Sequence, residues 1–206
     1  MFEPQWGENY PSWLIVLTPS VFEQYNNFSW VNAMNLLRSE IIGRPVGALE
    51  EKAKVGVARD VIVNPEDGRV LALVVGTGIF RQGQKVVGWQ DVRAVEESGV
   101  VIGSVEQMLA PREIVRVDQL MKDGFHLVGL PVVSTGGQKI GRVNNFCFDA
   151  VTGRLTQLYV RGYWGPNRII NWATVMRIEP NRVVIRHNET KGKGQARPVL
   201  YPLSNS

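Results

Sequence analysis

The sequence has almost none of the residues that supply thiol or imidazole chemistry. It contains one cysteine, Cys147, and two histidines, His126 and His187. A disulfide needs two cysteines, and a structural zinc site usually takes four cysteine or histidine ligands. An intramolecular disulfide and a four-cysteine zinc site are therefore excluded. We expect no metal, no cofactor and a reducing compartment.

Long hydrophobic runs are also missing. The longest apolar stretch near the N-terminus covers residues 13–17 and stops at Thr18 and Pro19, whereas a membrane helix needs about 20 apolar residues. No basic residue precedes this stretch, as one would in a secretory signal. We therefore expect a cytoplasmic protein without an integral membrane segment.

The sequence also lacks a dense concentration of positive charge. The net charge is +4, divided as −3 over residues 1–33, +4 over 34–185 and +3 over 186–206. Such a mild excess favours solubility. It is well short of the basic face that a dedicated nucleic-acid-binding protein carries.

What the sequence does contain is an internal repeat. Five short motifs recur in the same order at offsets of 83 to 86 residues, and they consist of glycines, a proline, a tryptophan and aliphatic residues. The pairs are residues 41–46 with 127–132, 54–56 with 139–141, 67–70 with 152–155, 87–89 with 170–172, and 99–102 with 182–185. Self-similarity of this kind indicates two copies of one structural unit.

Each copy has the pattern of β-structure. Residues 69–75 are a β-branched and apolar run of strand length, preceded by the turn sequence of residues 64–68. In that turn Pro65 presets φ, and we expect Asp67 and Gly68 to take the positive φ values of a hairpin. Short strands between such turns predict an all-β protein made of two small barrels. Trp89 and Trp172 occupy equivalent places, and we interpret each as a core or core-rim residue of its own copy.

The order of these motifs resembles the PRC-barrel domain. The resemblance rests on Gly43-Arg44-Pro45-Val46 and Gly129-Leu130-Pro131-Val132, the turns ending in Gly68-Arg69 and Gly153-Arg154, and the two tryptophans. It implies two tandem PRC-like β-barrels, similar to the cytoplasmic domain of the photosynthetic reaction-centre H subunit and to the C-terminal domain of a bacterial ribosome maturation factor. It also implies a non-enzymatic docking or assembly role. We place barrel one at residues 36–103, a linker at 104–121 and barrel two at 122–187.

No motif predicts catalysis, so we expect no catalytic, cofactor-binding or metal-binding residue. Cys147 lies between two phenylalanines and is interpreted as a packed thiol. The glycine-rich residues 76–83 lack the Gly-Lys-Ser/Thr ending of a phosphate-binding loop and are interpreted as a hairpin loop. In the equivalent loop of the second copy, Tyr163 and Trp164 are candidates for contact with a partner.

Both ends of the chain differ in composition from the repeats. Residues 1–33 hold three tryptophans and no basic residue, and we consider both a true start of translation at Met34 and an aromatic docking segment. Residues 188–206 are expected to form a disordered tail. In that tail Lys191, Lys193 and Arg197 are candidates for RNA contact.

The sequence therefore favours a cytoplasmic adaptor or assembly module with an unknown protein partner. The two copies either bind each other as a pseudo-dimer or present two surfaces. The alternative is an RNA-processing or ribosome-associated factor, which the basic tail and the ribosome-maturation resemblance support.

Overall fold

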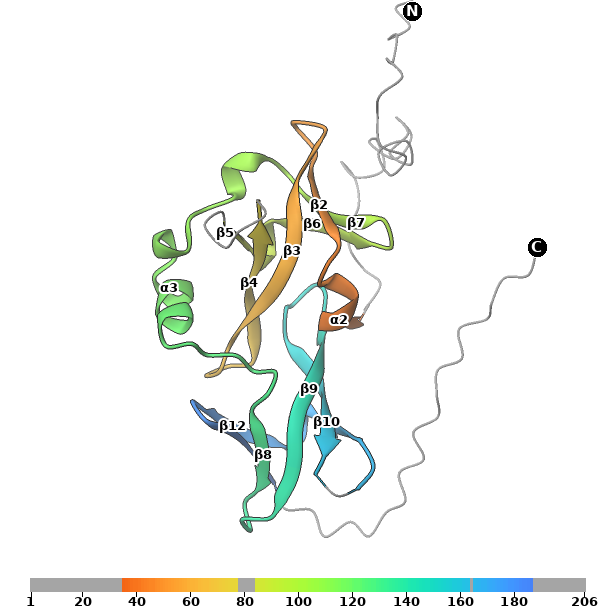
Figure 1. Ribbon diagram of the computed structural model, residues 1–206, viewed down its shortest axis with the longest axis vertical. Helices are drawn as coiled ribbons and strands as arrows, with labels where there is room; N and C mark the ends of the chain where they lie inside the picture. The colour runs from red at the N-terminus through yellow and green to blue at the C-terminus, as the bar shows by residue number, and fades with distance from the viewer. Residues whose placement is uncertain (1–34, 78–83, 164, 187–206) are drawn as a thin grey trace, which may run out of the picture.

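The repeat predicted from the sequence is present as two sheets with the same strand order. The structure is a computed structural model that describes residues 35–77, 84–163 and 165–186. Strands β2–β7, which we call unit one, follow the order β5-β4-β3-β2-β7-β6, and strands β8–β13, unit two, follow β11-β10-β9-β8-β13-β12. In each unit the first and last strands of the repeat pair in parallel and the other pairs are antiparallel. The predicted all-β class and the two copies are confirmed (Figure 1).

The strand bounds show how closely the copies match. In unit one the strands are β2 (Pro45–Ala48), β3 (Ala53–Asn64), β4 (Arg69–Gly76), β5 (Gln84–Gly88), β6 (Val92–Glu96) and β7 (Gly99–Ile102). In unit two they are β8 (Pro131–Ser134), β9 (Lys139–Asp149), β10 (Leu155–Gly162), β11 (Arg168–Asn171), β12 (Val175–Glu179) and β13 (Arg182–Ile185). A short 3-10 helix that begins at the tryptophan precedes the fifth strand of each unit. It is η2 (Trp89–Asp91) before β6 and η5 (Trp172–Thr174) before β12.

The long hairpin of each unit turns on a glycine. Gly68 has φ +66° and Gly153 has φ +68°, values that a residue without a Cβ adopts without strain. The expectation of a positive φ at Asp67 is wrong, because Lys52 is the one non-glycine residue with positive φ in the described ranges. Asp67 instead accepts the Arg69 N–H through its side chain at 3.1 Å. The turn spans residues 65–68, so a single left-handed residue suffices to close it.

The segment between the two sheets is a structured strap. It contains η3 (Val105–Gln107), η4 (Pro111–Glu113) and α3 (Val115–Lys122), and α3 lies beside β4 and β5 (Figure 1). Val117 of α3 is fully buried against Ala72, Val74 and Val86, with Ile114 and Met121 packed around them. The outer face of unit one is therefore covered by the strap.

The first described residues belong structurally to both units. Strand β1 (Asn35–Leu37) pairs antiparallel with β9 of unit two, and helix α2 (Arg38–Ile41) then leads the chain into unit one. The sequence assigned residues 36 and 37 to the first copy. In the structure β8 pairs with residues 139–142 of β9 and leaves residues 147–149 of that edge to β1.

The two hairpin turns face each other across the seam between the units. The Val70 N–H donates to the Gly153 carbonyl at 2.8 Å, and the Leu155 N–H donates to the Gly68 carbonyl at 2.9 Å. Turn one thus binds unit two and turn two binds unit one, with the same pair of bonds in each direction. The pairing follows an approximate twofold symmetry, as in an isologous dimer interface.

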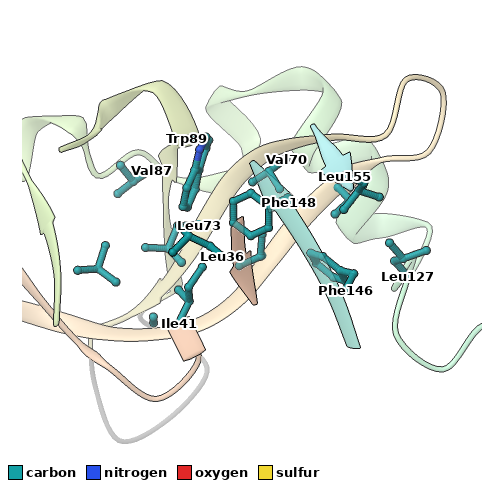
Figure 2. Close-up of a cluster of buried hydrophobic side chains, with 14 of the residues drawn as sticks. Leu36, Ile41, Val70, Leu73, Val87, Trp89, Leu127, Phe146, Phe148 and Leu155 are labelled. Carbon is teal, nitrogen blue, oxygen red and sulfur yellow. The ribbon is translucent and has the colours of Figure 1, made fainter. Parts of the chain in front are cut away.

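The tryptophans reach across this seam. The Trp89 indole N–H donates to the Ala150 carbonyl at 2.9 Å, and its ring meets Phe148 edge-on with centroids 4.8 Å apart (Figure 2). Trp172 makes the reciprocal contact, against Gly68 of turn one. The interpretation of Trp89 as a buried core residue is confirmed, but it packs on the other copy as well as its own. One hydrophobic core accordingly runs through both units.

Candidate interaction surface

The described residues bring together no candidate metal site, and the cysteine among them is buried. None of the described ranges holds a cluster of three or more histidine, cysteine, aspartate or glutamate side chains able to bind a metal ion. Cys147 is buried, and that burial raises the pKa of its thiol, so the reactive thiolate is disfavoured. The interpretation of Cys147 as a packed thiol is consistent with both facts.

One charged cluster was not predicted from the sequence. It lies at the seam between the two units. Asp60 on β3 accepts from Arg38 at 2.8 Å, and its other oxygen lies 3.3 Å from Nδ1 of His126. No spacing in the sequence joins these residues, because Arg38 precedes β2 and His126 precedes β8. Asp60 has no neighbouring nucleophile in this cluster, and its contacts join the segment before β2 and the segment before β8 to β3.

A groove of about 740 Å³ runs beside this cluster. One side is β3, and the other is the end of the strap, with Leu120, Met121, Phe125 and Leu127. Its lining combines apolar side chains with the polar and charged side chains of Arg38, Arg59, Asp60, Gln84 and His126. The groove contains no described arrangement of nucleophile, base and orienting group.

The outer face of unit two differs sharply from that of unit one. Equivalent positions on the two outer faces are Val74 and Tyr159, and Val86 and Ile169, since each pair occupies the same place in the strand registers. Val86 is fully buried under the strap, whereas Ile169 is 52% exposed. The position that the strap covers at Val86 is therefore open at Ile169, and Tyr159 beside it is half-buried.

Tyr163 extends this open face. It is 41% exposed, and the Arg142 guanidinium lies over its ring at 6.0 Å from the centroid. Arg161 lies directly opposite Arg142 in the β9–β10 register and is exposed on the same face. We call Arg142, Tyr159, Arg161, Tyr163 and Ile169 the unit-two patch. Exposed aromatic and arginine side chains are the residue types enriched at protein interfaces.

The remaining predicted contact residues lie outside the described residues. They are Trp164 in the loop after β10, and Lys191, Lys193 and Arg197 after β13. The sequence singled out Tyr163 from its loop, but it gave no reason to choose Tyr159, Ile169 or Arg142. Aligning the two copies position by position finds them, because it shows which apolar positions the strap covers in unit one.

The fold repeats one β unit twice, and the comparison with protein families finds the same two segments. The chain belongs to the PRC-barrel domain family, whose model matches residues 35–109 and 123–193. Domains of this family are generally non-catalytic modules for protein interaction or assembly. No curated protein matches the chain. Among the described helices, none has both the length and the apolar content to cross a membrane.

Proposed function

We propose that the protein is a non-enzymatic cytoplasmic adaptor that docks onto a larger protein complex through the unit-two patch. The observation that carries the proposal is the unequal covering of two equivalent faces. Unit one buries its outer face under α3, whereas unit two leaves Ile169 and Tyr163 exposed. An exposed patch with an apolar centre and charged surroundings is typical of an interaction site.

The side chains of the patch indicate the chemistry of the partner. Ile169 and the two tyrosines supply flat apolar area, and Arg142 and Arg161 supply positive charge at its border. A partner surface with an apolar centre and carboxylates around it is complementary to this arrangement, because opposite potentials steer and orient association.

The shared core gives the adaptor a fixed geometry. Because both units pack on one set of buried residues, the patch is presented by a rigid body and little ordering entropy is lost when a partner binds. The seam occupies the two hairpin turns, so those turns are not available to a partner. The adaptor interpretation therefore uses the outer face of unit two.

A pull-down from the native host tests this proposal with a matched pair of variants. Ile169 and Met176 are exposed to almost the same extent, 52% and 50%, but Met176 lies on β12 outside the patch. We expect Ile169→Asp to abolish capture of a defined set of proteins that the parent chain and Met176→Asp both retain. Equal capture by all three chains would contradict docking through this patch.

A second candidate function is binding to RNA through the same cationic surface. The stacking of Arg142 on Tyr163, with Arg161 alongside, is an arrangement that can also contact phosphates and bases. Treating half of each pull-down with ribonuclease separates the two functions. Partners that survive the treatment support the adaptor, whereas ribosomal proteins that vanish with the RNA support a ribosome-associated factor.

A further inference from the structure

Leu109 of the strap pairs with the outer edge of β5 in unit one. The Val86 N–H donates to the Leu109 carbonyl and the Leu109 N–H donates to the Val86 carbonyl, both at 2.9 Å. The two residues thereby form an isolated antiparallel bridge, in which each exchanges both of its backbone groups with the other. One copy of the repeat therefore shows how a short extended segment binds at this edge of the sheet.

Strand β11 is the equivalent edge of unit two. Ile169 faces Tyr159 in the register in which Val86 faces Val74, so the backbone N–H and C=O of Ile169 point away from β10. Within the described residues β11 is the last strand of its sheet, and no isolated bridge involves it. The Ile169 side chain is also exposed, whereas that of Val86 is buried. An exposed apolar residue on such an edge is a site for the addition of an extended segment.

The charge near this edge indicates what kind of segment it binds. Arg161 lies on the same face as Ile169, because Arg161 is two residues from Tyr159 on β10 and Tyr159 faces Ile169. Arg142 lies opposite Arg161 on β9, and none of the salt bridges among the described residues involves either arginine. The β11 sequence of a second copy, Arg-Ile-Ile-Asn, would bring a further cation and no carboxylate. Charge complementarity therefore favours an acidic segment of another protein over a second copy of this chain.

We propose that the outer edge of β11 binds an extended acidic segment of the partner protein as an added antiparallel strand. An apolar residue of that segment pairs with Ile169 as Leu109 pairs with Val86, and its carboxylates meet Arg161. The inference rests on the proposed function, because it names the kind of segment that docks at the unit-two patch. It adds that the partner is bound through its backbone, so the site recognises a stretch of extended chain and not a folded surface.

Synthetic peptides added to the full chain test strand addition. The probe is an acetylated and amidated Glu-Val-Leu-Val-Glu peptide. When its leucine pairs with Ile169, its glutamates, two residues away on either side, lie on the face of Arg161. A second peptide is N-methylated at the leucine and so lacks the N–H that would donate to the Ile169 carbonyl. A third has lysine in place of both glutamates. NMR titration of the Ile169 amide measures the affinity of each peptide, and hydrogen exchange of that amide measures its protection.

We expect saturable binding of the first peptide, with slower exchange of the Ile169 amide. The N-methylated peptide should bind about tenfold more weakly, because one backbone hydrogen bond is lost and the Ile169 carbonyl is left without that donor. The lysine peptide should also bind more weakly, and its difference from the first peptide should shrink at high salt. Equal binding of the first two peptides, or binding of neither, overturns strand addition. Protection of Ile169 that rises with protein concentration in the absence of peptide also overturns the proposal, because a second copy then occupies the edge.

A pair of variants separates this inference from the proposed function. Proline has no N–H, and the Ile169 N–H points away from β10, so Ile169→Pro removes a bond to the partner and none within the sheet. In pull-downs Ile169→Pro should lose the Ile169-dependent partner, whereas Ile169→Val should retain it. An NMR spectrum that matches the parent outside β10 and β11 shows that Ile169→Pro is folded, and if it is not, the peptide comparison decides alone.

The two proposals fail in different ways. Capture that is lost in Ile169→Asp but kept in Ile169→Pro overturns strand addition and leaves docking through the side chains of the patch. Peptide binding in the expected order, without an Ile169-dependent partner in any pull-down, supports the strand-accepting edge and contradicts the adaptor function.

Discussion

At the scale of single residues, the seam depends on two glycines that face two tryptophans. A Cβ added to Gly68 would lie 2.0 Å from Cζ2 of Trp172, whereas one added to Gly153 would lie 3.4 Å from Cδ1 of Trp89. The two glycine–tryptophan contacts occupy equivalent positions in the repeat, but the contact between Gly68 and Trp172 is much closer than that between Gly153 and Trp89. Turn one therefore tolerates no side chain. At turn two the nearest atom to an added Cβ is the Val70 carbonyl oxygen at 3.3 Å, so a methyl group there is tight but overlaps its neighbours far less.

The Gly68→Ala variant tests this close approach. The positive φ alone costs about 1–2 kcal/mol, and forcing a methyl into the Trp172 ring adds about 1–3 kcal/mol. Gly124→Ala is the matched control, because Gly124 has φ +65° and nothing within 4 Å of its added Cβ. Urea denaturation should show a larger loss of unfolding free energy for Gly68→Ala. Equal losses would mean that Trp172 does not pack on turn one.

The pKa of the Asp149 carboxyl depends on hydrogen bonds within turn two. Hydrogen bonds from the backbone N–H and the hydroxyl of Thr152 lower the pKa of Asp149 below its ordinary value. The folded-state pKa is depressed, so these bonds stabilise the fold above an unfolded pKa of about 3.9, and the contribution is lost as the pH falls through the folded pKa.

Substitution of Thr152 should move this pKa. In Thr152→Ala the backbone bond remains and the hydroxyl bond is lost, so the pKa of Asp149 should rise toward its ordinary value. Thr152→Ser keeps a hydroxyl and should leave the pKa near that of the parent. A carbon-13 NMR titration of the carboxyl measures both variants. An unchanged pKa in Thr152→Ala would show that the hydroxyl does not bind Asp149.

At the scale of elements, β1 determines how the chain enters the molecule. Leu36 is 5% exposed and lies in the shared core beside the unit-two strand with which β1 pairs (Figure 2). Strands this short are held by their neighbours rather than by local propensity. The stability of β1 and that of β9 should therefore be linked.

The Leu36→Ala variant tests that link. Truncation of a buried leucine costs about 2–5 kcal/mol, and amide exchange should accelerate at Phe148 on β9, its partner in the register. Val115→Ala is the control, since Val115 is 83% exposed and a surface change of this kind stays within about 0.5 kcal/mol. Faster exchange confined to unit one would place β1 with unit one, as the sequence suggested.

Whether an element could be predicted from the sequence depends on how far apart in the chain the residues that it contacts lie. The hairpins at residues 65–68 and 149–153 were found because a turn is written in adjacent residues such as Asp67-Gly68. The pairing of β1 with β9 was not found, because it joins residues more than a hundred positions apart. The exposure of Ile169 was missed for the same reason, since only the position of α3 shows that the equivalent Val86 is covered.

At the scale of the whole molecule, the two copies pack as one body and are not two separate barrels joined by a linker. Turn one binds unit two, turn two binds unit one, and β1 extends the sheet of unit two. The pseudo-dimer considered from the sequence describes this arrangement, with the covalent strap making the two halves unequal. That inequality leaves one outer face open, and the proposed docking site follows from it.

The measurement that tests this account most directly is urea unfolding of the full chain, followed by amide signals from each unit. Val87 in unit one and Leu158 in unit two are both fully buried in the shared core. The account predicts one transition with one midpoint for both signals, and a common downward shift of that midpoint in Trp89→Ala. Two separate midpoints, or a Trp89→Ala shift restricted to unit one, would contradict the shared core.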